Sequence, residues 1–283
     1  MKNHLVEISG EVSIATSQYG SSDPEVVLIH GLASNRHMYD LVAEELEEMG
    51  IASISIDQRG HGDSSKPDSG YDHQTISNDV AAVLGMYDTS RPKLLVGQSW
   101  GGAMVGDFAT KYPELVSGLI LIDGGVFDLK DRFASWEEVS ELLAPPRFTG
   151  VSFTDLEGRI ASGGWSERQL SCIMDNFDNI GGRAHPHLAF DNHMQILRAL
   201  YDYTPSKVLP PLEVPKLALL ADRSNSPLAN FENYEGLIEE ISSKYEIEVR
   251  EIKGARHDLH LQFPIETAAA IREMLIKTKV KGK

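Results

Sequence analysis

The chain has 283 residues, of which 41% are hydrophobic and 24% charged. This composition is that of an ordinary globular protein and excludes disorder as the default state. Lys and Arg total 26 against 42 Asp and Glu, and the resulting net charge of −16 repels nucleic acid and anionic membrane surfaces. We therefore expect a small-molecule substrate, with neither nucleic acid nor membrane as a partner. The oligomeric state stays open.

Two features bear on location. Residues 1–10 contain no apolar run of signal-peptide length, and the apolar stretches elsewhere are only as long as strands. The single cysteine, Cys172, cannot form an internal disulfide, which fits a reducing compartment. We expect a cytoplasmic protein in which this cysteine is a packing residue.

The order of apolar patterns predicts the fold class. Partial alternation over residues 4–16 is typical of an antiparallel hairpin. Further on, short apolar runs that indicate buried strands alternate with amphipathic helices. The strands are expected at 26–29, 51–57, 93–96, 116–123, 216–221 and 247–252, and the helices at 38–49, 77–86, 100–112, 231–245 and 265–277. This alternation predicts an α/β protein with a mostly parallel central sheet and helices on both faces.

The alternation stops in the middle of the chain. Residues 126–206 contain no buried-strand run, but they do contain amphipathic patches at 136–143 and 194–201. We therefore predict a core made of residues 1–125 and 207–283, with a helical cap formed by the inserted segment.

A serine enclosed by glycines follows the run at 93–96. The stretch Gly97-Gln98-Ser99-Trp100-Gly101 has the pattern of a nucleophile elbow, a sharp strand-to-helix turn that exposes one hydroxyl at the tip of the sheet. The serine backbone is strained in such a turn, and only glycine fits easily two residues away on either side. Ser99 is therefore the candidate nucleophile.

A serine hydroxyl needs a base, which is usually a histidine. His257 follows the last predicted strand in Gly254-Ala255-Arg256-His257. Its loop would lie at the carboxyl edge of the sheet, where ligands and catalysis gather in open α/β sheets. His260 is the alternative base, which the spacing from Gly254 disfavours.

Four landmarks in this order resemble those of the α/β-hydrolase superfamily. They are His30-Gly31, the turn Asp57-Gln58-Arg59-Gly60-His61-Gly62-Asp63-Ser64, the elbow, and Gly254-x-x-His257. The resemblance implies an α/β-hydrolase fold and an oxyanion hole made by the backbone N–H groups of Leu32 and Trp100, whose side chains would also line the pocket. It implies no cofactor.

The acid of the expected triad departs from the pattern of that superfamily. The acid usually lies a few residues after the strand at 216–221, where this sequence has Ser224 and Asn225, neither of which is a carboxylate. Asp123, at the end of an earlier strand, and Asp222 can both replace it. Asp123 is favoured because its strand end is expected next to the end of the elbow strand, whereas Asp222 comes early in its turn. Some members of the superfamily with the haloalkane dehalogenase architecture take their acid from that earlier strand end. A strand-end aspartate can also merely cap nearby N–H groups.

Aromatic and histidine side chains suggest further contacts. His30, Trp136 and Trp165 are expected to line a pocket that closes between cap and sheet. The cluster of His185, His187, Asp191 and His193 superficially suggests a metal site. Its spacing does not match an HxHxDH pattern, so no metal is expected.

Together these residues predict a carboxylesterase-like serine hydrolase. The expected substrate is a small to medium, largely apolar carboxylic ester or lactone, cleaved through an acyl-enzyme on Ser99. A serine elbow argues against haloalkane dehalogenase and epoxide hydrolase chemistry, in which an aspartate attacks carbon. C–C bond hydrolysis, cofactor-free perhydrolysis and a non-catalytic ligand-binding receptor stay open as alternatives.

Overall fold

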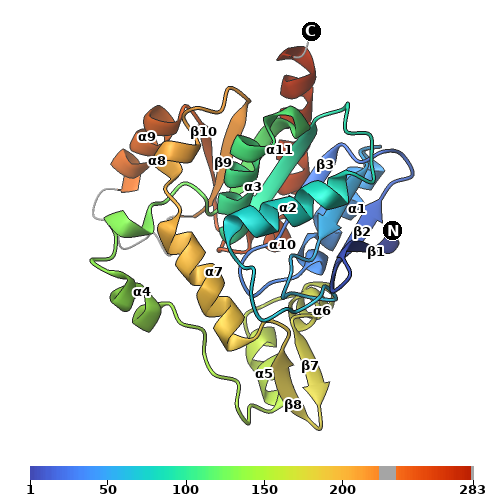
Figure 1. Cartoon of the computed structure of the whole chain (residues 1–283), viewed down its shortest axis with the longest axis vertical. Coiled ribbons are helices and arrows are strands. Elements are labelled where there is room, and N and C mark those ends of the chain that lie inside the picture. The colour runs from blue at the N-terminus through green and yellow to red at the C-terminus, as the bar shows by residue number, and fades with distance from the viewer. Residues whose placement is uncertain (223–233, 282–283) are drawn as a thin grey trace.

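The computed structural model describes residues 1–222 and 234–281, so Ser224 and Asn225 lie outside the described residues. An eight-stranded sheet with the order β1-β2-β4-β3-β5-β6-β9-β10 forms its centre (Figure 1). The strands are β1 (Lys2–Ser9), β2 (Val12–Tyr19), β3 (Val26–Ile29), β4 (Ser53–Ile56), β5 (Lys93–Gln98), β6 (Val116–Ile122), β9 (Lys216–Ala221) and β10 (Glu248–Ile252).

Strand direction follows the predicted pattern. The β1–β2 and β2–β4 pairs are antiparallel, and the other neighbours pair in parallel. Strands β3 and β9 match the predicted runs residue for residue, and both are buried along their whole length. Because the parallel strands end at the same edge, the residues that follow β5 and β6 lie close together.

Helices cover both faces of the sheet, as predicted. One face carries α2 (His73–Leu84), α3 (Trp100–Lys111) and α9 (Tyr234–Tyr245), which share an apolar core with the sheet. The other face carries α1 (Asp40–Glu48) and α11 (Pro264–Lys281), with a second core between them and the strands. In residues 1–222 and 234–281, no helix is both long and apolar enough to cross a membrane.

The chain between β6 and β9 leaves the sheet, and it differs from the predicted helical cap in one respect. It contains the helices α4 (Trp136–Leu142), α5 (Phe153–Ala161), α6 (Glu167–Met174), α7 (Phe190–Asp202) and α8 (Pro205–Val208), and a hairpin of β7 (Phe177–Ile180) and β8 (Arg183–Pro186). Most hairpin side chains are exposed, so no buried apolar run marks these strands in the sequence.

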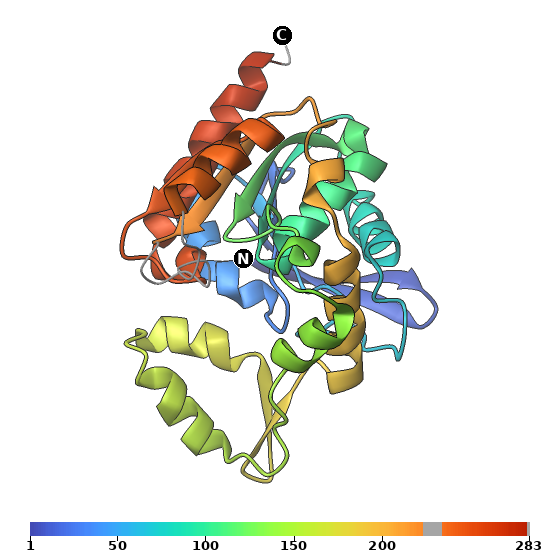
Figure 2. The ribbon, with the colours of Figure 1, turned by 90° about the vertical axis from the view of Figure 1, so that its left-hand side faces the viewer.

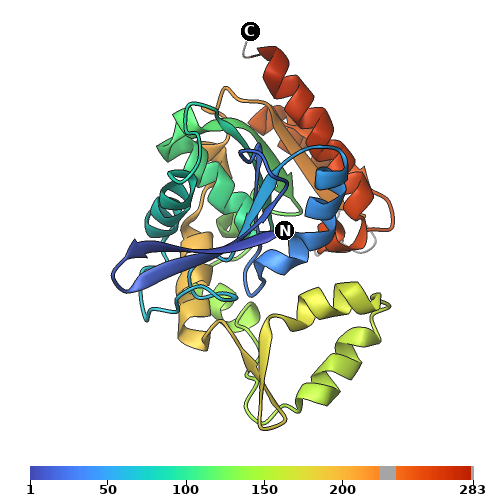
Figure 3. The same cartoon turned by 90° about the vertical axis from the view of Figure 1, so that its right-hand side faces the viewer.

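Figures 2 and 3 show α5, α6, β7 and β8 grouped together beside the core, with α6 toward it. The docking of α6 uses both polar and apolar contacts. The Asn35 side-chain amide donates to the Cys172 carbonyl (3.0 Å) and to the Asn176 side-chain oxygen (2.9 Å). Cys172 is buried and packs with Met38 and Leu261, which agrees with its predicted packing role.

Candidate active site

Ser99 lies between β5 and α3 in a strained conformation, with φ +54° and ψ −118°. A Cβ atom on Gly97 would lie 2.1 Å from the Gly101 carbonyl oxygen, and one on Gly101 would lie 2.4 Å from the Ile29 carbonyl oxygen. Neither position has room for a side chain. The Ser99 N–H donates to the Ile122 carbonyl of the neighbouring strand (2.8 Å). This is the geometry predicted for a nucleophile elbow.

Asp123 is the aspartate that contacts the candidate base. Its Oδ2 atom lies 2.7 Å from Nδ1 of His257, and its Oδ1 accepts the Ala221 N–H at 3.0 Å. The Asp123 side chain is 2% exposed, whereas that of His257 is 40% exposed. Because β6 and β9 are neighbours, the end of β9 supplies the amide that fixes this carboxylate. The structure thus joins Asp123 and His257.

Asp222, the other candidate acid, supports the loop that carries His257. Its Oδ2 accepts the Gly254 N–H at 2.6 Å, and its own N–H donates to the Ala255 carbonyl at 3.0 Å. These bonds hold the loop after β10 against the end of β9. Asp222 therefore shapes the backbone that leads to the histidine.

The charges around His257 favour its protonated form. Burial lowers the pKa of this imidazole, but the hydrogen bond to Asp123 and the charges of Asp258 and Asp123 outweigh it, so the pKa lies above its usual range. Burial also raises the pKa of the Asp258 carboxyl, whose Oδ1 accepts from the Gln98 amide at 3.4 Å. When Nδ1 donates its proton to Asp123, Nε2 of a neutral His257 is left as the basic nitrogen.

The loop after β3 passes directly beside the nucleophile. A Cβ atom on Gly31 would lie 3.1 Å from the Ser99 Cβ. The next amide along this loop is that of Leu32, and the amide after Ser99 is that of Trp100. Within the described ranges neither N–H donates to a protein acceptor. Both remain available to a ligand, as an oxyanion hole requires.

Two buried histidines hold this loop in place. His30 donates from Nδ1 to the Gly31 carbonyl (2.7 Å) and accepts the Gln58 N–H at Nε2 (3.1 Å). His61 accepts the Ala33 N–H at Nε2 (3.3 Å). Burial lowers the pKa of His30 and takes that of His61 well below its usual range, so both rings are neutral hydrogen-bonding groups.

Two other predicted groups lie away from the pocket. His260 is fully buried, its ring centroid is 4.5 Å from that of Tyr39, and neither ring nitrogen has a partner among the described residues. Burial lowers its pKa to about 3. The Trp100 indole is also fully buried and stacks on His61 at 5.7 Å, so the expectation that it lines the pocket is wrong.

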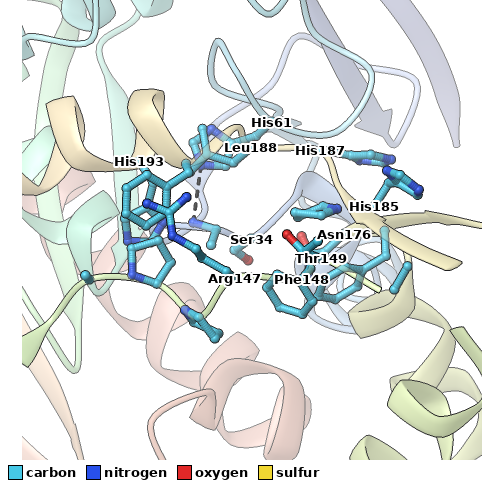
Figure 4. Close-up of a pocket in the computed structure, with 18 of the residues that line it drawn as sticks. Ser34, His61, Arg147, Phe148, Thr149, Asn176, His185, His187, Leu188 and His193 are labelled. Atoms are coloured by element: carbon cyan, nitrogen blue, oxygen red, sulfur yellow. Dashed lines mark hydrogen bonds between the residues drawn. The ribbon is translucent and has the colours of Figure 1, made fainter. Parts of the chain in front are cut away.

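A cavity of about 670 Å³ lies between the loop after β3 and the segment that follows β6 (Figure 4). Its apolar walls include Leu143, Phe148, Phe177, Leu188 and Phe190. Its polar groups include Ser34, Arg147, Arg183, His185, His187 and His193. Sequence reasoning missed both arginines. The only signal for Arg147 is its place between a Pro-Pro turn and Phe148.

The residues that line this cavity do not include Ser99 or His257, nor the predicted pocket residues Leu32, His30, Trp136 and Trp165. His30 is buried beneath the loop after β3. Trp136 packs beside Tyr201, at 5.8 Å, under the Arg198 guanidinium. Trp165 is covered by the Arg256 guanidinium, 4.1 Å from the ring centroid. A cation from the protein itself thus lies over each indole ring.

The histidine cluster of the sequence is dispersed in space. His187 bonds Asp178 at 3.2 Å through Nε2. In the part of the chain that the structure describes, no group of three or more His, Cys, Asp or Glu is arranged to hold a metal ion. His185, His187 and His193 instead contribute to the cavity wall.

The family model for serine aminopeptidase S33 matches residues 20–262. The chain belongs to this family of α/β hydrolases. Its curated relatives include 2-(acetamidomethylene)succinate hydrolase of Mesorhizobium japonicum, with 32% identity over 114 residues, which are 40% of each chain. An esterase of Mycobacterium tuberculosis is 34% identical over 112 residues, covering 39% of this chain and 36% of the esterase. The chain thus matches about two fifths of the length of its first curated relatives.

Solved structures resemble the S33 family member over nearly its whole length. E-2-(acetamidomethylene)succinate hydrolase has a TM-score of 0.77 and 22% identity, covering 97% of this chain and 98% of that one. The thioesterase domain from the curacin biosynthetic pathway has a TM-score of 0.75 and 20% identity, covering 96% and 99%. These likenesses confirm the predicted α/β-hydrolase fold.

Proposed function

We propose that this S33 family member is a serine hydrolase that cleaves a small to medium, largely apolar carboxylic ester or lactone. The observation that carries the proposal is the 2.7 Å hydrogen bond between Asp123 and His257, made at the same edge of the sheet as the strained Ser99. The three residues have the roles of acid, base and nucleophile in a catalytic triad. The esterase relative supports the same reaction class.

The reaction begins with proton transfer. Asp123 holds the Nδ1–H of His257, so Nε2 accepts the Ser99 hydroxyl proton while Oγ attacks the substrate carbonyl carbon. The N–H groups of Leu32 and Trp100 stabilise the resulting oxyanion, each by about 3 kcal/mol. The His257 imidazolium then protonates the leaving alcohol as its bond to the carbonyl carbon breaks. His257 then takes a proton from water, whose oxygen attacks the acyl carbon. His257 returns this proton to Ser99 Oγ as the bond between Oγ and the acyl carbon breaks, which releases the acid.

The cavity supports the substrate size. Its volume of about 670 Å³ is within the range of small-molecule sites, and most of its wall is apolar. Ala33, which follows Leu32, is part of that wall, so the cavity starts beside the proposed oxyanion hole. In this proposal the segment 126–206 acts as a cap that supplies the opposite wall.

A second candidate function uses the same serine on another bond. The relative from Mesorhizobium japonicum is named for 2-(acetamidomethylene)succinate, and this name denotes a compound without an ester group. Hydrolysis of a bond other than an ester, C–C bonds included, is therefore the alternative reaction. Product analysis by mass spectrometry after incubation with a panel of esters, lactones and diketones separates the two.

A fluorophosphonate probe tests the nucleophile. We expect rapid covalent labelling that maps to the Ser99 peptide, is lost in Ser99→Ala, and persists in the matched control Ser69→Ala, which changes an exposed serine outside the cavity wall. Labelling that persists in Ser99→Ala would contradict the assignment. Absence of labelling in the unmutated protein would favour a non-catalytic ligand-binding protein.

A further inference from the structure

We infer that the cavity binds a carboxylate group of the substrate through the guanidinium of Arg147, so that the substrate combines an apolar body with one anionic end. The inference rests on the proposed function, because it names the class of ester or lactone that the Ser99 site receives. It starts from the charge of the cavity wall. The chain has 42 acidic residues, yet none of the residues in the wall is Asp or Glu, while Arg147 and Arg183 both belong to it.

Arg147 is held in an orientation suited to an anion. Its guanidinium lies over the Phe190 ring, 4.0 Å from the centroid, and Phe190 also lines the cavity. Stacking occupies the face of the guanidinium and leaves the N–H groups at its edge to bind a carboxylate in bidentate geometry. Across residues 1–222 and 234–281, the Arg147 guanidinium has no carboxylate or hydrogen-bond partner.

Arg183 has a different part. One of its Nη atoms donates to the Gly150 carbonyl, which ties the loop that carries Arg147 to strand β8. A second bond, from the Ala184 N–H to the Val151 carbonyl at 2.9 Å, braces the same loop. Arg183 is thus a positioning residue for this loop, whereas no protein acceptor among the described residues occupies a donor of Arg147.

Two further polar groups, both neutral, lie beside Arg147. Figure 4 shows Arg147, Ser34 and His193 gathered in one part of the cavity. His193 is only 9% exposed, and burial lowers its pKa to about 4, so its ring is neutral near pH 7. The buried Ser34 hydroxyl has no partner among the described residues. Neither side chain carries a negative charge that would compete with an anionic ligand for the Arg147 guanidinium.

The position of this anion site relative to the elbow sets the form of the substrate. Ser34 lies two residues after Leu32, whose N–H is the proposed oxyanion donor, and the cavity runs from there toward Arg147. A substrate that reaches both groups has its carbonyl at Ser99 and its carboxylate beyond Ser34, separated by an apolar chain. The net charge of −16 would disfavour such an anion, and a locally cationic cavity overcomes this.

Paired substrates test the inference. The probes are 4-nitrophenyl hydrogen adipate, which carries a terminal carboxylate, and 4-nitrophenyl hexanoate, its neutral six-carbon counterpart. We expect kcat/KM to favour the adipate, and Arg147→Met to lower the adipate-to-hexanoate ratio by about 10- to 100-fold, the range for a hydrogen bond to a charged group. Arg159→Met, which removes an exposed arginine of α5 outside the cavity wall, should leave the ratio unchanged.

The outcomes separate this inference from the proposed function. Equal kcat/KM for both esters, or a ratio that Arg147→Met leaves unchanged, would overturn the anion site while turnover of the hexanoate upholds the serine hydrolase. If the unmutated protein turned over neither ester and was not labelled by the fluorophosphonate probe, both the anion site and the serine hydrolase would be overturned. Competitive inhibition by free adipate that Arg147→Met weakens would support the site independently.

Discussion

The carboxyl edge of the sheet and the cavity wall that faces it are built in different ways. At the edge, Asp123, His30 and His61 are buried and hydrogen-bonded to backbone groups of neighbouring strands and loops. In the facing wall, Arg147 lies on an irregular loop and is exposed. In the proposed function, backbone geometry fixes the chemistry, whereas substrate selection depends on side chains that a few substitutions can change.

The largest effect is expected from the buried acid. Asp123→Asn should lower kcat by about 10⁴-fold, because the amide favours the wrong tautomer of His257. Asp222→Asn should lower it less than about tenfold, since Asp222 bonds the Gly254 amide and acts only through the loop. Steady-state hydrolysis of 4-nitrophenyl hexanoate measures both. The reverse ranking would assign the acid to Asp222.

The pH dependence sharpens the assignment of the base. His257 must be neutral to accept the Ser99 proton, and its pKa lies above the usual value near 6.5. The rate should therefore fall as pH falls through a value above 6.5, by about tenfold for each further pH unit. Asp258→Asn should move this limb to lower pH, because it removes a charge that raises the pKa. A kcat/KM profile with its acid limb below pH 6 would contradict the prediction.

The attachment of α6 tests how much the facing wall depends on the core. Asn35→Ala removes the donor to the Cys172 carbonyl and to Asn176, which should cost about 1 to 3 kcal/mol of stability. We expect KM to rise more than kcat falls, because the wall loosens while the triad is untouched. Thermal unfolding and steady-state kinetics measure the two effects. Gln74→Ala, an exposed amide on α2, is the control, and equal behaviour of the two variants would refute the prediction.

The effect that is smallest near pH 7 concerns His260, whose ring nitrogens have no partner among the described residues. Its pKa is about 3 in the folded chain and near 6.5 when unfolded, so protons bind the unfolded state more tightly. This histidine therefore removes stability as pH falls below 6.5, by about 2 kcal/mol at pH 5. His260→Leu should abolish that contribution. Urea unfolding at pH 7 and pH 5 gives the difference, and an unchanged difference would show that the ring is not buried as neutral imidazole.

Sequence reasoning succeeded where a constraint on the backbone restricts which residue types the sequence can have. The strands of the core are apolar because both faces of the sheet are covered. Gly97 and Gly101 can be recognised in the sequence as elbow residues because no side chain fits at either position. Asp123 was favoured over Asp222 because its strand neighbours that of Ser99, and the structure joins it to His257.

The same reasoning failed where side-chain partners decide the outcome. Trp136 and Trp165 were expected to line the pocket, but neither is in the wall of the cavity and an arginine lies over each ring. The β7–β8 hairpin is exposed and leaves no apolar pattern. Arg147 is one of many charged residues in the sequence, and only the structure places it on Phe190 in the cavity wall.

The segment 126–206 is continuous in the chain and lies between β6 and β9, although these two strands are neighbours in the sheet. Asp123 precedes the segment, and Ser99 and His257 also lie outside it. A single recombination event within the gene can therefore replace the whole facing wall and leave every strand of the sheet and all three residues intact. Descendants of one ancestral gene can in this way acquire new substrate specificities while they keep the same catalytic residues.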